Sequence, residues 1–266
     1  MPNCGIIDAP RLTWLALDDA NHQVLTYFTD ASFKSMKLFS GSLYFLRRPA
    51  ELKNYKAFAN IETLHLSLFF RESRPPTFPG RVKLPMVRTL RLAVNSPRFV
   101  GSWLQTLDVP EVRTLVIGRT SLPYEGTVIL DVIGKINRPS KVQHLTFSRL
   151  TLKASNIHSI FGGFLQIRVI VLVNCSVEKG FFETFFLDNH YGVCPSLGTL
   201  VLRQSVFNPV DLDQFMRRRA NLSDPSFPFI LKKVHVRIDL PKTPFDGLME
   251  LFDLVQQYPQ LMTVED

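Results

Sequence analysis

Three histidines occupy variable positions of a repeating apolar pattern, and histidine is the side chain best suited to metal binding or proton transfer near neutral pH. They are His65, His144 and His235. Successive members lie three repeats apart, so neighbouring strands about 4.8 Å from each other would keep their rings too distant to ligate one metal ion. We therefore expect each histidine to face solvent or a partner, and we predict no metal site.

Motifs that carry enzyme chemistry are missing from the sequence. Gly134 and Lys135 are followed by Ile136, and Ile129 stands where a phosphate-binding loop would need its first glycine. The sequence has neither a nucleophile elbow nor a zinc-binding helix motif. It predicts a protein that is not an enzyme and that needs no cofactor.

The composition and the cysteines narrow the class of protein. Hydrophobic residues make up 45% of the 266 residues and include 22 phenylalanines, which indicates a substantial packed core. Cys4, Cys175 and Cys194 are odd in number and lack metal-ligand spacing, so we expect reduced thiols. No apolar stretch reaches the length of a membrane helix, and residues 1–10 lack the pattern of a secretion signal. These features predict a cytoplasmic or nuclear protein without membrane contact.

One apolar pattern repeats along the whole chain: an apolar residue, two variable residues, a second apolar residue, one variable residue and a third apolar residue. Full matches begin at residues 12, 33, 61, 87, 112, 142, 167, 197 and 231, and Leu261 and Val264 form a clipped tenth. The second match is Phe33, Met36 and Leu38. The mean step between matches is about 27 residues, which is typical of a leucine-rich repeat. Such regularity predicts stacked units that bury their apolar faces against one another.

Between these matches the apolar spacing changes to that of helices. The expected helical faces are Phe181, Phe182, Phe185 and Phe186, and Phe245, Leu248, Phe252 and Val255, the second with Thr243 as its cap and Pro244 in its first turn. A helix after each strand predicts an α/β fold of the leucine-rich-repeat solenoid type, with a curved parallel sheet on the concave side and helices on the convex side. We expect a single domain over residues 1–266 with nine to ten irregular repeats, lacking one or both terminal caps.

A polar ladder is expected eight residues after the start of five units. The residues there are Asn95, Thr120, Cys175, Ser205 and Asp239. Their side chains can satisfy backbone groups between neighbouring coils.

Several stretches resemble the irregular repeats of fungal F-box proteins with leucine-rich repeats: NIETLHLSL, VPEVRTLVIG, PSKVQHLTFSRLTL and CPSLGTLVLRQSVF. The resemblance extends from about residue 10 to the end of the chain. In that family an N-terminal F-box docks on the Skp adaptor of a cullin ubiquitin ligase, and the repeats hold the substrate. The resemblance thus implies substrate recognition. No F-box segment precedes Leu12, so Skp binding is expected only if an F-box lies outside this chain.

Alternation along the strands places the third, fifth and seventh residues of each unit on the concave face. In the second unit these are Ser35, Lys37 and Phe39. The candidate binding residues, an apolar group with a basic flank, are Arg91, Val116, His144, Val169, Val171, Val173, Val201, Arg203, Lys233, His235 and Arg237. An apolar centre with a charged rim is typical of protein interfaces. The alternative is a misjudged register, with the valines covered by the convex layer or by another segment.

A net charge of +8 would attract acidic surfaces of proteins, nucleic acids or lipids. Arg217, Arg218 and Arg219 follow the apolar helical residues Leu212, Phe215 and Met216, and they form either the wet side of that helix or a nuclear-import signal. The sequence contains no recognised nucleic-acid motif. Protein binding is therefore the favoured function. Nucleic-acid or acidic-surface binding and a sensor or regulatory repeat array are the alternatives.

Overall fold

The computed structural model describes residues 6–17, 28–44, 56–69, 82–94, 107–120, 141–156, 161, 164–186, 193–220, 231–238 and 245–265. The chain divides into two compact units. Unit 1 comprises Met1–Ser121 and Lys135–Lys141, and unit 2 comprises Leu122–Gly134 and Val142–Asp266. The predicted cap residues Thr243 and Pro244 and the ladder residues Asn95 and Asp239 lie outside the described residues.

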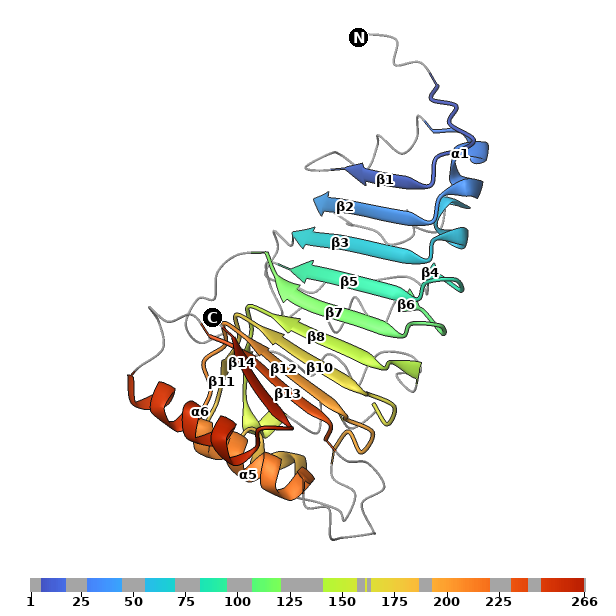
Figure 1. Ribbon diagram of the computed structural model, residues 1–266. Coiled ribbons are helices and arrows are strands. Elements are labelled where there is room, and N and C mark those ends of the chain that lie inside the picture. The colour runs from blue at the N-terminus through green and yellow to red at the C-terminus, as the bar shows by residue number, and fades with distance from the viewer. Residues whose placement is uncertain are drawn as a thin grey trace. The chain divides into compact units, whose positions relative to one another are not determined.

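Unit 1 is built on five parallel strands, adjacent in the order β1, β2, β3, β5 and β7 (Figure 1). They are Trp14–Leu17, Leu38–Tyr44, Thr63–Phe69, Thr89–Val94 and Thr114–Arg119. The register aligns residues 14, 38, 63, 89 and 114, so the steps between strands are nearly equal. Helix α1 (Asp30–Ser35), the 3-10 helix η2 (Lys56–Asn60) and the short paired strands β4 (Val82–Lys83) and β6 (Leu107–Asp108) lie in the connections.

Unit 2 also has five parallel strands, adjacent in the order β8, β10, β12, β13 and β14. They are His144–Ser148, Val169–Val173, Thr199–Arg203, Lys233–Arg237 and Met262–Glu265. Here the register aligns residues 145, 170, 200, 234 and 262, so the steps between strands are unequal. The expected α/β class with parallel strands is confirmed in both units.

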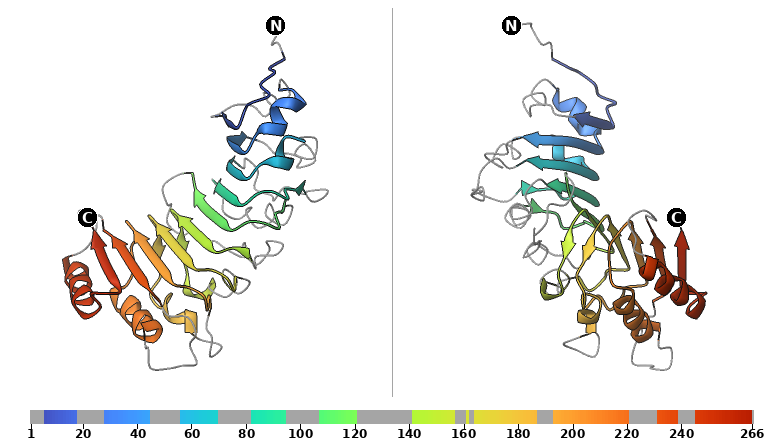
Figure 2. Two further views of the ribbon diagram at one scale, coloured as in Figure 1. Left: turned by 45° about the vertical axis from the view of Figure 1, so that its right-hand side comes forward. Right: turned by 90° about the vertical axis from the view of Figure 1, so that its left-hand side faces the viewer.

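The connections of unit 2 hold its helices and a second, small sheet. They contain β9 (Thr151–Leu152), η6 (Ala154–Asn156), β11 (Ser176–Val177), η7 (Glu183–Phe186), α5 (Pro209–Ala220) and α6 (Phe245–Gln257). Strand β9 pairs with β11, and α5 and α6 lie against each other along one side of the main strands (Figure 2). None of the helices in the described ranges combines the length and the apolar character of a membrane-spanning segment.

The predicted apolar residues form the buried face of these strands. All three residues are buried in the seven matches that begin at residues 61, 87, 112, 142, 167, 197 and 231. The first match, Leu12, Leu15 and Leu17, is half-buried. Burial alternates along β10, where Ile170 and Leu172 are 2% and 1% exposed and the valines between and beside them are half-buried. The period of two identified the core face of these strands correctly.

The register predicted for the second unit is wrong. Strand β2 aligns Leu38 with Trp14 on one side and with Thr63 on the other, so the unit begins at Met36 and not at Phe33. Phe39, which the sequence placed on the concave face, is 1% exposed. A shift by an odd number of residues moves every side chain of a strand to the opposite face.

The cause of this error is a glycine at an apolar position. Gly41 occupies the third buried site of the unit, and a Cβ atom added there would lie 3.0 Å from Cζ of the Phe39 ring. The ring of Phe39 thus occupies space that a larger residue at position 41 would need, and it also meets Phe58 edge-on with ring centroids 5.2 Å apart. A pattern of apolar residues does not include glycine, so it misses a buried site where a large neighbouring side chain leaves room only for glycine.

The clipped tenth unit also needs correction. Strand β14 aligns Met262 with Val234 and Val264 with Val236, so the first buried residue is Met262, which is 1% exposed. Leu261, the predicted apolar residue, is half-buried. Consecutive apolar residues at 261 and 262 gave the sequence pattern no means of choosing between them.

The two predicted aromatic helices have different outcomes. Residues 181–186 form turns and the 3-10 helix η7 instead of an α-helix. Helix α6 is confirmed as a helix, and among its described side chains Leu251 and Leu254 are buried, whereas Phe252 is 55% exposed. The side chains of Phe245 and Leu248, which belong to the predicted face, lie outside the described residues. Positions 251, 252, 254 and 255 are all apolar, so contact with neighbouring elements and not periodicity alone selects the buried face.

An aromatic cluster forms the centre of the unit 2 core. It contains Phe147, Phe161, Phe181, Phe182, Phe185 and Phe215, with neighbouring ring centroids 5.3–6.4 Å apart. Phe147 belongs to the buried face of β8, and Phe215 belongs to α5. The cluster therefore joins the helical layer to one face of the strands, and it leaves the other face for the candidate site.

Candidate protein interface

The outward side chains of the unit 2 strands lie opposite the aromatic cluster, and we call them the strand face of unit 2. The register arranges them in three rows across the strands. The rows are His144, Val169, Thr199 and Lys233; then Thr146, Val171, Val201, His235 and Thr263; then Ser148, Val173, Arg203, Arg237 and Glu265.

Nine of the eleven predicted binding residues lie together on this face: His144, Val169, Val171, Val173, Val201, Arg203, Lys233, His235 and Arg237. The other two, Arg91 and Val116, are neighbours on β5 and β7 of unit 1. They belong to unit 1, and the candidate site consists of residues of unit 2.

The valines form a continuous apolar patch. Three follow one another along β10, and Val201 of β12 lies beside Val171 in the middle row. All four are half-buried, while their strand neighbours Ile170 and Leu200 are each 2% exposed on the opposite face. The described helices lie on the opposite face and do not cover them, so the predicted register is correct for these residues. Contiguous apolar surface that stays partly accessible to solvent is a feature of interaction sites.

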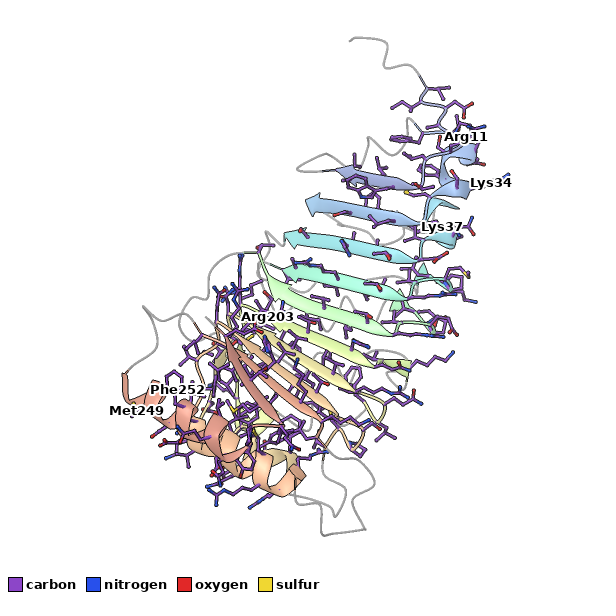
Figure 3. All side chains as sticks on the ribbon, viewed as in Figure 1. Arg11, Lys34, Lys37, Arg203, Met249 and Phe252 are labelled. Atoms are coloured by element: carbon purple, nitrogen blue, oxygen red, sulfur yellow. The ribbon has the colours of Figure 1, made fainter. Side chains whose placement is uncertain are left out.

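Two arginines lie side by side at the edge of the valine patch. Arg203 of β12 is aligned with Arg237 of β13, and both side chains are exposed. Arg203 is labelled in Figure 3. Within the described part of the chain, neither arginine makes an ion pair. Like charges directly opposite each other on neighbouring strands repel, so this pair favours a bound anion.

The carboxylate at the end of the same row is directed toward another residue. Glu265 is aligned with Arg237, but its Oε2 atom lies 3.4 Å from Nε2 of His235. Nδ1 of His235 is 2.9 Å from the hydroxyl oxygen of Thr263, a hydrogen bond in which either partner can donate. The side chain of His235 is only 14% exposed. Two contacts to β14 thus hold this ring, for which the sequence predicts only contact with solvent or a partner.

The histidines do not form a metal site in the described residues. Within the described ranges, no three His, Cys, Asp or Glu side chains come close enough to hold a metal ion. His65 lies in unit 1 beside Arg91, and burial together with the positive charge of Arg91 lowers the pKa of its imidazole. His65 is therefore neutral at pH 7.

A repeated backbone turn directly follows the row that contains the arginines and fixes the ends of three strands. Arg149, Asn174 and Gln204 directly follow β8, β10 and β12, and they have φ angles of 59°, 52° and 49°. Their N–H groups donate to the carbonyl oxygens of residues 173, 203 and 237 at 2.8, 2.9 and 2.6 Å. These bonds tie each strand end to the next strand. Sequence analysis missed the turn because only asparagine among the three favours the left-handed conformation.

The predicted polar ladder is confirmed at Cys175 and Ser205. The N–H of Cys175 donates to Oγ of Ser205 at 3.1 Å, and the Ser205 hydroxyl donates to the Arg203 carbonyl at 3.0 Å. The Cys175 thiol donates to the Phe147 carbonyl at 3.5 Å. The ladder therefore supports the backbone that carries Arg203.

The buried thiols agree with the expected reduced state. Cys175 and Cys194 are free and buried, and Cys4 lies outside the described residues. Burial raises the pKa of Cys175 to about 11, and it also raises the pKa of Cys194. Both groups remain protonated at neutral pH and are poor nucleophiles.

Arg219 is a structural residue that sequence analysis placed in solvent. Arg217 and Arg218 are exposed, as expected, but Arg219 is 5% exposed. Its guanidinium donates to the carbonyl oxygens of Val193, Cys194 and Pro195 at 2.7, 3.3 and 3.3 Å. Arg219 thereby anchors α5 to the turn before β12. The burial of Arg219 could have been predicted from its spacing, because it lies four residues after Phe215 and three after Met216, on the same face of the helix.

Comparison of the chain with protein-family models, with curated proteins and with solved structures finds no match. The surface chemistry of the described strands is therefore the basis on which a function can be argued.

Proposed function

We propose that this chain is a leucine-rich-repeat solenoid that binds another protein through the strand face of unit 2. The repeat assignment is supported by apolar triplets that are buried at seven of nine predicted positions and by parallel strands in constant register. Each unit of such an array buries its apolar face against its neighbours and presents its variable residues on the other face.

The observation that carries the proposed function is the valine patch beside the arginine pair. Val169, Val171, Val173 and Val201 are uncovered by the described helices, and Arg203 and Arg237 adjoin them. Desolvation of the valines would supply affinity, because each Å² of apolar surface removed from water contributes about 25 cal/mol. The arginines at the rim would supply specificity and faster association.

A double substitution in the patch tests this proposal. In Val171→Asp/Val201→Asp, two carboxylates replace adjacent side chains in the middle row, and we expect partner proteins captured by the wild-type chain to be lost. Quantitative mass spectrometry after affinity capture provides the measurement. The matched control is Val206→Asp/Val210→Asp, since Val206 and Val210 are 64% and 50% exposed and lie outside the strand face.

Both variants must retain the circular dichroism spectrum and the melting temperature of a folded chain. Capture that is equal for the two folded variants and the wild type would remove the strand face of unit 2 as the interface. Loss in the control alone would assign binding to the α5 side.

A more specific role follows from the resemblance to F-box proteins with leucine-rich repeats. We propose that the chain acts as the substrate-recognition region of a ubiquitin ligase receptor. The test is co-purification of the native protein with its Skp adaptor and cullin, compared with the chain of residues 1–266 alone. Absence of both ligase components from the native protein would overturn the ligase role and leave the binding proposal untouched.

A further inference from the structure

We infer that the partner segment recognised by the strand face of unit 2 is acidic and aliphatic. Its carboxylates would lie against Arg203 and Arg237, and its aliphatic side chains would lie on Val171, Val173 and Val201. This inference rests on the proposed function and specifies the chemistry of the partner.

Charge on the face requires a negative partner. Arg203, Lys233 and Arg237 are its exposed cations, and Glu265 is its one carboxylate in the described strands. Glu265 forms no ion pair with either arginine among the described residues, and three cations against one carboxylate leave the face with a net positive charge. The arginines also project from neighbouring strands, about 4.8 Å apart. That spacing allows adjacent acidic groups to meet both guanidinium groups, each of which can form two parallel hydrogen bonds with a carboxylate.

The apolar part of the face favours protein over nucleic acid. Val173 lies beside Arg203 in one row, and Val201 precedes Arg203 by two residues on the same strand. Aliphatic side chains of a peptide can therefore reach the valines while an adjacent carboxylate reaches Arg203. Single-stranded nucleic acid uses aromatic platforms for its bases. No Phe, Tyr or Trp lies on the described strand face of unit 2.

The dimensions of the patch suit a short segment. Two rows are about 7 Å apart along a strand, and the three strands β10, β12 and β13 span about 10 Å. An extended peptide advances about 3.3 Å per residue, so about four to six residues cover the patch. The face thus calls for a few neighbouring side chains, with acidic and aliphatic residues close together.

Fluorescence anisotropy with synthetic probes tests the inference on the full chain. The first probe is a labelled peptide of about eight residues that contains two glutamates followed by two valines. The second replaces the glutamates with glutamines, and the third is single-stranded oligothymidylate. We expect the glutamate peptide to bind about tenfold more tightly than the glutamine peptide, because two ion pairs are lost in the latter.

Charge reversal locates the contact. Arg203→Glu/Arg237→Glu should weaken binding of the glutamate peptide by about tenfold or more. The matched control is Arg168→Glu/Lys232→Glu, which changes the net charge equally at exposed residues just before β10 and β13. The control should change the dissociation constant by less than about threefold, because a general change in net charge is screened by salt.

Several outcomes would overturn the inference. Equal binding of the glutamate and glutamine peptides would exclude the acidic requirement, and equal loss in both charge-reversal variants would exclude a specific arginine contact. Tighter binding of oligothymidylate that depends on Arg203 and Arg237 would replace the acidic segment by nucleic acid. No binding of any probe would also overturn the acidic segment, whereas the proposed function falls only if the Val171→Asp/Val201→Asp variant still captures its partners.

Discussion

The two units use the same buried triplet but connect their strands differently. The aligned positions of unit 1, at 14, 38, 63, 89 and 114, are almost evenly spaced. In unit 2 the step from 200 to 234 is longer than the step from 145 to 170, and the connections into β13 and β14 contain α5 and α6. The strands of unit 2 nevertheless pair residue by residue without interruption, as the strands of unit 1 do. Added residues are thus accommodated in the connections, and the outward side chains keep their rows.

The strand ends differ as well. Strands β2, β3, β5 and β7 run for six or seven residues, whereas β8, β10, β12 and β13 stop after five. In unit 2 the left-handed residue after β8, β10 and β12 ends the strand and starts the turn that leads to the small sheet and its ladder. Three of these four five-residue strands therefore end at a left-handed residue.

The charges of the two units also differ in their pairing. In unit 1 Lys37 contacts Glu62 at 3.1 Å, and Lys141 forms an ion pair with Glu111. In unit 2 Arg203 and Arg237 adjoin an apolar patch and form no ion pair with any described residue. Paired surface charges contribute little to binding another molecule, whereas unpaired cations beside apolar surface are suited to it. Arg91 of unit 1 also lacks an ion pair among the described residues, but unit 2 aligns two such arginines on adjacent strands beside the valines, and this pair favours its strand face as the candidate interface.

The largest effect is expected from breaking the core of unit 2 alone. Phe181→Ala removes a ring that contacts Phe161, Phe182 and Phe185, and it should lower the free energy of unfolding by about 3–5 kcal/mol. Hydrogen exchange followed by mass spectrometry should show lost protection in β8, β10 and β12. Equal loss of protection in β3 and β5 would mean that the two units unfold together.

A smaller loss is expected at the anchor of α5. Arg219→Leu keeps an apolar stem but leaves three carbonyl oxygens without their donor, so we expect the free energy of unfolding to fall by about 2 kcal/mol. Urea denaturation measures it. Arg219→Lys retains the charge and should recover part of the loss. A neutral Arg219→Leu variant would show that these bonds do not stabilise the folded chain.

Filling the glycine site of unit 1 should cost less. Gly41→Leu restores the regular apolar triplet but meets the Phe39 ring, so the variant should be destabilised by about 1–2 kcal/mol. Phe39→Leu/Gly41→Leu should recover most of that stability, because the smaller side chain at position 39 leaves room. Thermal melts of the wild type, both single variants and the double variant give the interaction free energy between positions 39 and 41. A more stable Gly41→Leu single variant would contradict the packing described for this unit.

The smallest effect concerns pH and unit 1. The pKa of His65 in the folded chain is lowered from 6.5, first by burial and then by Arg91. Near and below pH 6.5 the imidazole takes up a proton more readily in the unfolded chain than in the folded chain. The free energy of unfolding therefore decreases as the pH falls from about 6.5 toward the pKa of the folded state, and His65 adds no pH dependence well above pH 6.5. His65→Gln should flatten this part of the stability curve, and Arg91→Gln should reduce its slope. An unchanged curve in His65→Gln would assign the pH dependence to other groups.

Much of the fold could be predicted from the sequence because the buried strand residues are aliphatic and alternate. Seven triplets and the rows of the strand face follow from that alternation alone. The remainder depends on contacts that spacing does not encode. Gly41 is buried because Phe39 is large, η7 replaces an α-helix in an aromatic-rich turn, and Arg219 finds its carbonyl partners only after α5 has packed.

The candidate site was predicted in its members but not in its internal contacts. Alternation identified Val171, Val201, Arg203 and Arg237 as outward residues. It could not show that Glu265 reaches His235 in place of Arg237, since both lie within reach of the same carboxylate in the aligned strands. The pairing of β13 with β14 decides which cations stay free.

The left-handed residues after the unit 2 strands offer a route to thermostability engineering. A side chain in that conformation costs about 1–2 kcal/mol relative to glycine, which is partly offset because glycine loses more freedom on folding. Gln204 has this unfavourable conformation in the turn that follows the arginine row, whereas asparagine at position 174 tolerates it. Gln204→Gly would raise the melting temperature while leaving every outward side chain of β12 in place, so this chain can be made more stable without a change in its recognition surface.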